Sequence, residues 1–497
     1  MAQHQVRLAE LLCALSVTLD LAMAQPPEKS LRSCLVATRL ADRLHVTDKR
    51  TVYYATLLRH LGCTATTHEE LHLAGPRAAE LRPLAERTDS ASRRESLNYL
   101  RHVGKGAGIR RLQYVARTLT TNEDDVLRAI CEVGSMLAEH LGLGPSTAEA
   151  LYQNLERWDG KGMPRGLAGK EIHIATRIAE VATQAVIVGG KTVVKRRGGW
   201  LDPFVVAQYD DSLVADLDDI DVWQATVDAE PRPWWPAPDL DELARTFAYF
   251  VDLKSPYLFG HSTEVAALAD EAGRLLHLED AERATLRRAA LLHDLGRVAV
   301  PTDVWERPGR LRRAEWEQVR LHPYQSERIL SRSAELAPIA VLAALHHERL
   351  DGSGYPRHAK GGELSTAARI LAAADCYQAL TQDRPYRSAH SAKGAAEIIL
   401  AEAAAGRLDA ACVKAVLAAA GQQVPDRRMS GPAGLTEREV DVLRLLARGS
   451  SNADIARELV VSRRTAEHHV QHIYDKIGVS TRAAAALFAM QHGLFTL

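Results

Sequence analysis

The sequence predicts an all-α protein made of two related helical domains followed by a small helical unit. Three observations lead to this fold class. Only 5% of the 497 residues are aromatic, while alanine and leucine, both strong helix formers, are abundant. The two halves of the chain repeat one pattern of helices and turns. Residues 435–497 carry apolar side chains at helical spacing, separated by residues that cap helices.

Length and composition bound the possible functions. A chain of 497 residues is too long for one hydrophobic core, so we expect several domains. The net charge of −1 excludes a general affinity for nucleic acid, and any such contact needs a local patch. The apolar run 11–19 resembles a signal peptide, but the flanking Glu10 and Asp20 favour an amphipathic helix. The six cysteines form no CxxC motif and no apolar run reaches transmembrane length. We therefore expect a cytoplasmic protein without a membrane partner.

An internal repeat relates the two halves. Residues 155–164, LERWDGKGMP, align with residues 347–356, HERLDGSGYP. Residues 57–63, LLRHLGC, align in the same order with residues 291–297, LLHDLGR. Matches that keep their order along the chain indicate an internal duplication.

The second half contains residues typical of metal ligands. His346 and His347 are adjacent, so they cannot share one helix face and can reach two different centres. The pair His293–Asp294 offers a neutral nitrogen and a hard oxygen, and an aspartate can bridge two metal ions. Further single candidates are His261, His322 and Asp375. Seven ligands with one shared aspartate are enough for a two-metal site.

Residues 240–425 resemble the HD-GYP family, because the HD pair, the HH pair and the GSGYP turn occur in family order. These proteins are phosphohydrolases of the HD superfamily that typically open cyclic di-GMP. The resemblance implies one metal ion on His261, His293, Asp294 and Asp375. It implies a second on Asp294, His322, His346 and His347. Such ligands suit Fe or Mn, with Zn or Mg still open. Two cations would activate a bridging water and neutralise charge on a phosphodiester.

The sequence departs from the family pattern at three positions. Arg297 replaces the usual lysine and keeps its charge, but arginine cannot give up a proton. Tyr257 replaces a glutamate that provides a third metal site in some members, so we expect two metal ions. Gln378 replaces a frequent aspartate. A catalytically silent, nucleotide-sensing regulator is therefore the alternative to an active enzyme.

The resemblance also implies which residues act on a substrate. Catalysis is assigned to Asp294 and Arg297. The expected contacts to a cyclic dinucleotide come from Arg297, Gly354, Tyr355, Pro356, Arg384 and Arg387.

The first half keeps the pattern without the ligands. Arg59 and His60 stand where the second half has the HD pair, and Asn154 and Leu155 stand where it has the HH pair. The remaining exchanges are Lys29 or a neighbour for His261, Thr183 for Asp375 and Met163 for Tyr355. We interpret residues 1–230 as a degenerate HD-type domain that docks, senses or dimerises. A rebuilt site using His60, His102 and His173 is the alternative.

The remaining boundaries follow from composition. The proline-rich stretch 229–238 marks a junction in which Trp234 and Trp235 clamp the linker onto a domain. The phosphohydrolase domain then covers residues 231–425, residues 426–434 form a linker, and residues 435–497 form the last domain.

The last domain has the pattern of a helix-turn-helix. Val440, Leu443 and Leu446 share one helix face. We expect Gly449 to end this helix. Asn452 and Ser462 are expected to cap the next two helices, and a short turn joins those two.

Residues 435–497 resemble the LuxR-type DNA-binding domain along their whole length. The resemblance implies DNA contacts from Arg463, Arg464, Thr465, His468, Gln471, His472 and Lys476. One copy would make few phosphate contacts, so we expect a homodimer on two half-sites. A protein-interaction module without a DNA role is the alternative.

Overall fold

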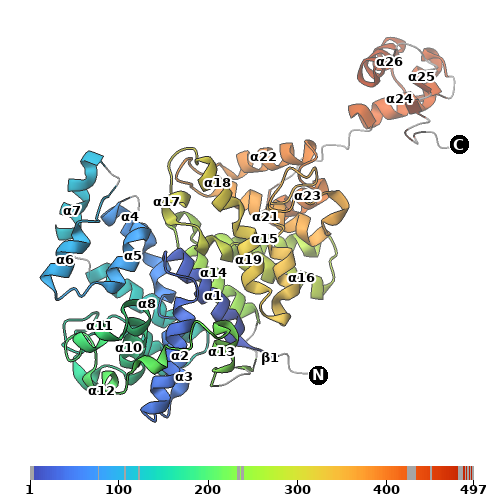
Figure 1. Ribbon diagram of the computed structural model, residues 1–497. Helices are drawn as coiled ribbons and strands as arrows, with labels where there is room; N and C mark the ends of the chain where they lie inside the picture. The colour runs from blue at the N-terminus through green and yellow to red at the C-terminus, as the bar shows by residue number, and fades with distance from the viewer. Residues whose placement is uncertain are drawn as a thin grey trace. The chain divides into compact units, whose positions relative to one another are not determined.

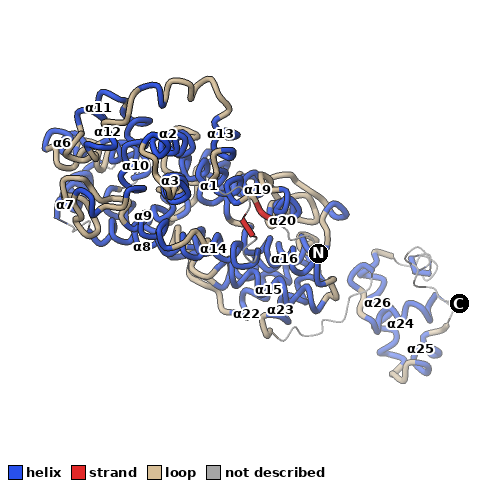
Figure 2. Tube along the Cα trace, turned by 90° about the horizontal axis from the view of Figure 1, so that it is seen from below, coloured by secondary structure: helices blue, strands red, loops and turns tan. Residues whose placement is uncertain are grey.

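The computed structural model describes residues 5–75, 78–105, 108–120, 124–231, 235–236, 240–422, 432–447, 450–479, 485–486, 488–489, 492 and 494. These residues are almost entirely helical or in turns, which confirms the all-α class (Figure 2). The strands β1 (Gln5–Val6) and β2 (Trp235–Pro236) form one short antiparallel pair. The predicted roles of Trp234 and Gly449 concern positions outside the described residues. The chain divides into two compact units, residues 1–422 and 423–497.

The first half of the larger unit is a bundle of mostly short helices. They are α1 (Leu8–Ala22), α2 (Lys29–Arg43), α3 (Lys49–Leu57), η1 (Leu61–Thr66), α4 (Thr67–Ala74), α5 (Ala78–Arg87), α6 (Arg93–Leu100), η2 (Gly108–Arg110), α7 (Arg111–Thr120), α8 (Asp124–His140), α9 (Pro145–Tyr152), η3 (Gly169–Glu171), α10 (Ile174–Val188), α11 (Gly190–Lys195), α12 (Pro203–Val206), η4 (Asp211–Leu213) and α13 (Val222–Asp228).

The second half repeats this order with fewer insertions. Its helices are α14 (Leu240–Asp252), η5 (Pro256–Leu258), α15 (His261–Leu275), α16 (Asp280–Leu292), η6 (Leu295–Ala299), α17 (Thr302–Trp305), α18 (Arg313–Arg320), α19 (His322–Leu330), η7 (Ala334–Leu336), α20 (Ala337–Ala343), η8 (Gly361–Glu363), α21 (Thr366–Thr381), α22 (Ala392–Ala404) and α23 (Ala410–Ala419).

Equivalent side chains hold equivalent helices in the two halves. Asp20 accepts hydrogen bonds from the backbone and hydroxyl of Ser30 at 2.9 and 2.6 Å, and Asp252 does the same for Ser262 at 3.0 and 2.7 Å. The guanidinium of Arg177 bonds Asp202 at 2.7 Å, and that of Arg369 bonds Asp409 at 3.1 Å. The two halves therefore share a scaffold down to the buried polar contacts that fix it.

A pair of glycines shows where each half needs close backbone packing. A Cβ on Gly296 would lie 2.0 Å from the carbonyl oxygen of His322, and a Cβ on Gly62 would lie 1.9 Å from that of Ile130. Only glycine lets η6 approach α19, and η1 approach α8, this closely. The same contact makes Ile130 the first-half counterpart of His322.

The two halves meet through equivalent helices. The first-half helix α1 packs against η6 and α19, and its second-half equivalent α14 packs against η1 and α8. Figure 1 shows α1 and α14 at the junction between the halves. Leu11 of α1 borders the same small apolar cavity as Phe247 of α14 and Leu330 of α19. The prediction of an amphipathic helix is therefore wrong for α1: almost all of its faces are buried, including the polar residues Ser16 and Asp20, because it lies between two cores.

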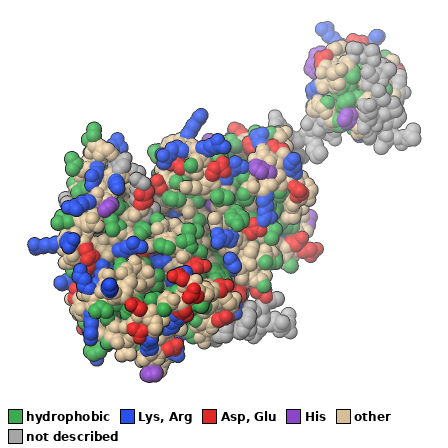
Figure 3. All heavy atoms as spheres, viewed as in Figure 1, with side chains coloured by type: hydrophobic (Ala, Val, Ile, Leu, Met, Phe, Trp, Pro, Cys, Tyr) green, Lys and Arg blue, Asp and Glu red, His purple; other side chains and the backbone are tan. Residues whose placement is uncertain are grey.

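On the face of the larger unit visible in Figure 3, basic and acidic side chains are interspersed, in keeping with the net charge of −1. Among the described helices, none has both the length and the apolar composition of a bilayer-spanning segment.

The smaller unit has its own core. Its helices are α24 (Glu437–Ala447), α25 (Asn452–Glu458) and α26 (Arg463–Ile477), preceded by η9 (Pro432–Gly434). Leu443, Leu446, Ile455, Val470 and Ile473 are buried together, as the apolar spacing predicts.

The helix caps of this unit are partly as expected. Ser462 caps α26 by accepting a hydrogen bond from the backbone of Thr465 at 3.1 Å. The prediction that Asn452 caps α25 is wrong, because Asn452 is the first helical residue and Ser451 is the cap. Ser451 and Asp454 form a reciprocal capping box, which outweighs the asparagine preference.

Candidate metal centre and substrate cleft

Six helical segments deliver the seven candidate ligands to one place in the second half. His261 and His322 are the first residues of α15 and α19, His293 follows α16, and Asp294 precedes η6. The structure also brings in His346 and His347 after α20, and Asp375 from within α21. All of them except His347 are buried, and His347 is half-buried. The structure therefore assembles every candidate ligand named from the sequence.

Backbone carbonyls fix the tautomer of three of these histidines. The Nδ1 atoms of His293, His322 and His346 donate to carbonyl oxygens three residues earlier in the chain, at 2.7, 2.6 and 2.7 Å. A carbonyl can only accept, so each Nδ1 carries a proton, and in the neutral ring each Nε2 keeps the lone pair that can bind a metal. Imidazoles oriented in this way are prepared to coordinate a cation.

Gln378 fixes the orientation of a fourth imidazole, that of His261. Its side-chain amide nitrogen donates to Glu264 at 2.7 Å, which turns its oxygen toward His261 Nδ1. The Nε2 atom of His261 therefore also faces the cluster with its lone pair. This position was noted from the sequence only as a missing aspartate.

The two oxygens of Asp294 face two separate groups. Oδ2 lies 3.5 Å from His261 Nε2 and 3.3 Å from His293 Nε2. Oδ1 lies 3.2 Å from His322 Nε2 and 3.6 Å from His346 Nε2. Asp375 stands beside the first group, 3.3 Å from His261 Nε2, and 3.6 Å from His347 Nδ1 on the other side. One carboxylate thus lies between two sets of donors.

The residues present fit a pair of cations. Both oxygens of Asp294 and the Nε2 atoms of His261 and His293 are buried and make no hydrogen bond of good geometry among the described residues, although Arg297 forms an ion pair with Oδ2. Unsatisfied buried polar atoms are rare, and an ion is one of their ordinary explanations. Imidazole and carboxylate donors are those that first-row divalent metals prefer.

Electrostatics keep the two carboxyl groups charged. Burial alone would raise the pKa of Asp294, but Arg297 and His293 outweigh it and hold that pKa well below its usual value. Burial likewise opposes ionisation of Asp375, and His261 and His293 lower its pKa well below the ordinary range. For His346, burial and then the neighbouring His293 lower the pKa, so this imidazole stays neutral. Burial opposes protonation of His293, but Asp294 and then Asp375 outweigh it and raise the pKa of His293 to about 10, so this ring releases a proton when a cation binds.

A cleft of about 740 Å³ opens onto this cluster. His322, His347 and Asp375 contribute to its floor. Its walls are unusually rich in aromatic and arginine side chains. These are Tyr257, Trp305, Trp316, Tyr355, Tyr386, Arg297, Arg307, Arg310 and Arg384. The tryptophans came to light only from the structure, because nothing in their sequence spacing links them to the histidines.

Three of the predicted substrate residues line this cleft. The guanidinium of Arg297 stacks over Trp305 at 4.7 Å, and its Nε lies 2.8 Å from Asp294 Oδ2. The ring of Tyr355 lies 4.7 Å from that of His347. Arg384 donates one nitrogen to the carbonyl of Tyr257 at 2.9 Å, while its buried Nη2 has no partner among the described residues.

The structure does not bring the other three to the cleft wall. Arg387 donates to the carbonyls of Leu380 and Gln382 at the end of α21. Gly354 shapes the turn, because a Cβ there would lie 2.4 Å from Glu348 Cα. Pro356 follows in the same turn and does not line the cleft. These three positions support the shape of the site instead of facing its cavity.

Glu348 is a supporting residue that sequence reasoning missed. It is buried, and its carboxylate accepts hydrogen bonds from the backbone of Arg357 at 2.7 Å and of Ala359 at 3.0 Å. The turn that carries Tyr355 is thereby tied to the residue next to His347. The repeat could have revealed it, because Glu156 stands at the equivalent place in the first half.

In the smaller unit, α26 presents most of the predicted DNA-contacting residues to solvent. Arg463, Arg464, Thr465, His468, Gln471 and His472 are all exposed. Lys476 instead donates to Glu439 at 2.6 Å and to the carbonyl of Gly434 at 3.2 Å. That contact ties α26 to α24 within the unit.

Comparisons with known proteins agree with this geometry. A family model described as HD domain matches residues 109–187 and 245–412, and one described as bacterial regulatory proteins of the luxR family matches residues 433–489. A 3′3′-cGAMP-specific phosphodiesterase of Vibrio cholerae is 30% identical over 417 residues, which cover 78% of this chain and 89% of that protein. A cyclic di-GMP phosphodiesterase of Pseudomonas aeruginosa is 39% identical over 137 residues, 27% of this chain and 33% of that protein.

A solved structure shows the same relationship. The crystal structure of a cyclic GMP-AMP-specific phosphodiesterase of Vibrio cholerae matches with a TM-score of 0.56 and 27% identity, and the match covers 85% of this chain and 99% of that chain. Fold, buried histidine–aspartate cluster and relatives together define a helical, metal-dependent phosphohydrolase joined to a DNA-binding unit. The chain belongs to the HD-GYP family of phosphodiesterases, and its C-terminal unit is a LuxR-type helix-turn-helix domain.

Proposed function

We propose that the second half hydrolyses a phosphodiester bond of a cyclic dinucleotide with two divalent cations. The observation that carries this proposal is the position of Asp294, whose two oxygens face separate pairs of imidazole nitrogens beneath an open cleft. The first cation would use His261, His293, Asp294 and Asp375. The second would use Asp294, His322, His346 and His347. We favour Fe or Mn as the metals, since the donors are imidazoles and carboxylates.

The substrate class is inferred from the cleft and the relatives. The relatives' names specify 3′3′-cGAMP and cyclic di-GMP. A cyclic dinucleotide has two flat bases and two phosphates. The aromatic walls, among them Trp305, Trp316 and Tyr355, offer stacking surfaces for bases. Arg297 and Arg384 offer charged donors for phosphate oxygens.

The proposed mechanism assigns distinct tasks to the chain's own residues. When bound, the cation pair supplies Lewis-acid stabilisation of phosphate charge and activates water for attack. Arg384, through its unpartnered Nη2, would bind a non-bridging phosphate oxygen. Arg297 would swing between Asp294 and the phosphate, and it adds charge but no proton. Gln378 and the three backbone carbonyls would keep the imidazole lone pairs aimed at the centre throughout.

Metal content and turnover measured on one preparation of the full chain test this proposal. We expect close to two equivalents of metal and release of a linear dinucleotide from cyclic di-GMP or 3′3′-cGAMP. Asp294→Ala and Asp375→Ala should each lower metal content and abolish turnover. Thr183→Ala changes the first-half counterpart of Asp375 and should leave both unchanged. A wild-type chain that holds both metals but opens neither dinucleotide would refute hydrolysis.

A catalytically silent sensor is the second candidate. One observation favours it: Arg297 lies as close to Asp294 as a hydrogen-bonded partner would, where the family usually has lysine. In that case ligand binding would persist without turnover. The variant Arg297→Lys distinguishes the sensor from the enzyme. If the wild type has no turnover and Arg297→Lys has turnover at unchanged metal content, the wild type is a sensor.

We further propose that α26 reads DNA as part of a homodimer. Its exposed face carries Arg463, Arg464, Thr465, His468, Gln471 and His472. Recognition helices place such residues in the major groove, and one copy offers few phosphate contacts. Lys476 is excluded from this set in our proposal, because Glu439 already pairs with it.

Selection of bound fragments from a genomic library tests the DNA proposal. We expect enrichment of a sequence with two half-sites, and sedimentation of the complex should show two chains per site. Arg464→Ala should abolish enrichment, whereas Arg444→Ala on α24 should preserve it. Enrichment that survives Arg464→Ala would reject the assignment of α26.

A further inference from the structure

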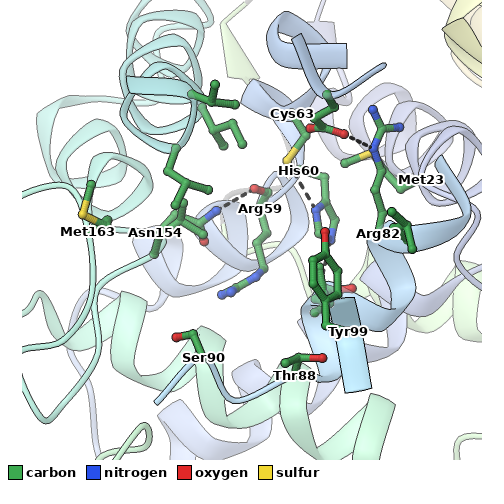
Figure 4. A pocket seen from close by; sticks show the side chains of 18 of the residues that line it. Met23, Arg59, His60, Cys63, Arg82, Thr88, Ser90, Tyr99, Asn154 and Met163 are labelled. Carbon is green, nitrogen blue, oxygen red and sulfur yellow. Dashed lines mark hydrogen bonds and ion pairs between the residues drawn. The ribbon is translucent and has the colours of Figure 1, made fainter. Parts of the chain in front are cut away.

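The first half contains a cavity of about 380 Å³ at the place where the second half has its ligand cluster. Its lining includes Arg59 and His60, the counterparts of the HD pair, and Asn154 and Leu155, the counterparts of the HH pair. Ile130, the counterpart of His322, also lines it. Figure 4 shows Arg59, His60 and Asn154 among the side chains arranged around an open space. Loss of the ligands has therefore left a pocket and not a filled core.

This pocket is not suited to a metal ion. Where the second half has His261 and His293, the first half has Lys29 and Arg59, both of which repel a cation. Ile130 and Leu155 replace two imidazoles with hydrocarbon. The positive charges and the apolar groups exclude the chemistry of the second half from the first.

Most of the cavity wall is apolar. It is built by side chains from several helices and from the equivalent of the GSGYP turn. They include Tyr99, Leu127, Ile130, Leu155, Met163 and Trp200. A pocket of this size with such walls is typical of sites for small organic molecules.

The charged groups around the cavity neutralise one another in pairs. Lys29 bonds Glu86 at 2.6 Å, Arg82 bonds Glu70 at 2.7 Å, and Arg157 bonds Asp89 at 2.9 Å. Since these pairs balance, the wall offers no excess charge to an ionic ligand. An uncharged occupant fits it best.

Arg59 is the polar group that points to a ligand. Its Nη2 bonds Glu180 at 2.5 Å, but its Nη1 is buried and has no partner among the described residues. In Figure 4 the guanidinium of Arg59 extends into the open space toward Thr88 and Ser90. A buried charged donor left unpaired is strongly unfavourable, and an acceptor from a ligand would satisfy it. Gln25 Oε1 is a second unpartnered atom on the wall and could accept from the same ligand.

We propose that this cavity binds a small, uncharged, mostly apolar molecule that presents a carbonyl oxygen to Arg59 Nη1. The apolar walls hold its body, and the arginine fixes its orientation. The first half is then a ligand-binding module whose site descends from the duplicated metal centre. This inference concerns residues 1–230 and stands independently of the reaction proposed for the second half.

Binding of fluorescent probes to the full chain tests the inference. The probe is 6-propionyl-2-dimethylaminonaphthalene, which is uncharged and aromatic and carries one ketone. N-phenyl-1-naphthylamine is the comparison without a carbonyl, and 1-anilinonaphthalene-8-sulfonate is the comparison with a negative charge. We expect saturable binding of the ketone probe, about tenfold tighter than that of either comparison.

Variants locate the site and the contact. Leu127→Trp fills the cavity and should lower the affinity for the two uncharged probes at least tenfold. Leu112→Trp, at an exposed position outside the cavity, should change neither. The double variant Arg59→Met with Glu180→Gln removes the guanidinium without leaving an unpaired carboxylate. It should weaken only the ketone probe.

Each contrary result rejects a defined part of the inference. Ketone-probe affinity retained by Leu127→Trp would reject the site. Equal affinity in the double variant and the wild type would reject the contact with Arg59. Preference for the sulfonate would reject the uncharged class. Thermal unfolding of each variant verifies that the chain is folded.

Discussion

At the residue scale, the candidate metal centre depends on where protons sit on four imidazoles. Three histidines donate Nδ1–H to a carbonyl three residues earlier, and His261 donates to Gln378. Each Nε2 atom is thereby turned toward Asp294 before any ion arrives. Such preparation lowers the conformational entropy lost on binding.

Gln378 gives the first prediction. Gln378→Leu removes the acceptor of His261 Nδ1–H, so that ring can rotate or change tautomer. We expect metal affinity or turnover to fall about 10- to 100-fold, as for other residues that orient metal ligands. Metal content after dialysis, with turnover on the same sample, measures the effect.

A matched pair of variants checks the cause. Gln378→Asp supplies another acceptor and should restore most of the loss. Gln382→Leu, four residues further along the chain, should change nothing. Full metal content and turnover in Gln378→Leu would show that His261 needs no orienting partner.

The ligands could be predicted from the sequence, but their supports could not. Histidine and aspartate stand out because few structural roles demand those types in adjacent pairs. The role of Gln378 depends on Glu264, which lies 114 residues away and turns the amide. Two other contacts likewise form only when the helices pack. Arg297 approaches Asp294, and Ile130 takes the place in the first half that His322 has in the second.

At the scale of elements, the clearest duplicated feature is a turn. It follows His346 and His347 in the second half, and it follows Asn154 and Leu155 in the first half. Glu348 accepts from two backbone amides of its turn, and Glu156 accepts from those of Arg165 and Leu167 at 2.7 and 2.9 Å. A buried carboxylate with two such bonds holds a loop more firmly than neutral groups would. The turn therefore behaves as a fixed part of the scaffold in both halves.

Substituting this carboxylate gives the second prediction. Glu348→Ala should raise hydrogen exchange at Arg357 and Ala359 at least tenfold, because a hydrogen bond to a charged group contributes about 1.5 kcal/mol or more. Turnover should fall, since the turn positions Tyr355 beside His347. Exchange measured by mass spectrometry and steady-state kinetics report the two effects.

The first half offers the control. Glu156→Ala should raise exchange in its own turn, at Arg165 and Leu167, and leave turnover unchanged. Equal loss of turnover in both variants would mean that the glutamates act through global stability instead of through their turns.

Helix type and order could be predicted from the sequence, whereas some boundaries could not. The cap preference of asparagine predicts Asn452, but the structure has Ser451 at the cap. Asp454 decides the position, because it completes a reciprocal pair with Ser451. A choice between adjacent caps thus depends on a third residue.

At the scale of the whole larger unit, the duplication has produced an internal pseudo-dimer. The first long helix of each half packs within its own half and also against the other half, α1 against η6 and α19, and α14 against η1 and α8. Sequence analysis could separate the halves by their repeat but could not foresee this reciprocal packing. Glu10 and Asp20 made α1 look amphipathic, which hid its burial between the two halves.

The junction contains a buried lysine that predicts a pH effect. Lys254 donates from Nζ to the carbonyl of Val298 at 3.3 Å, and its own carbonyl accepts from Thr67 of the first half at 2.8 Å. Burial, and then Arg82, lower its pKa to about 7 against Glu306, Glu70 and Asp303, which raise it.

The direction of the change in stability with pH follows from the number of protons that the folded and unfolded chains bind. Between the folded pKa of about 7 and the ordinary value near 10, the unfolded chain binds a proton at Lys254 that the folded chain does not. The wild type should therefore gain stability relative to Lys254→Met as the pH rises from 7 to 10. Urea unfolding at three pH values measures this, with exposed Lys393→Met as the control. A difference that stays constant with pH would contradict the prediction.

The packing of α1 and α14 across the junction predicts that both halves unfold together. Leu11 is fully buried in α1 and borders second-half residues, and Leu40 is fully buried in α2. Leu11→Ala should lower the free energy of unfolding by about 2–5 kcal/mol. If residues 1–422 are one cooperative unit, Leu40→Ala should also lower the temperature at which phosphodiesterase activity is lost. Calorimetry and residual turnover after heating should then share one midpoint for each variant. A Leu40→Ala chain whose activity survives to the wild-type temperature, while a separate transition appears below it, would show that the halves unfold independently.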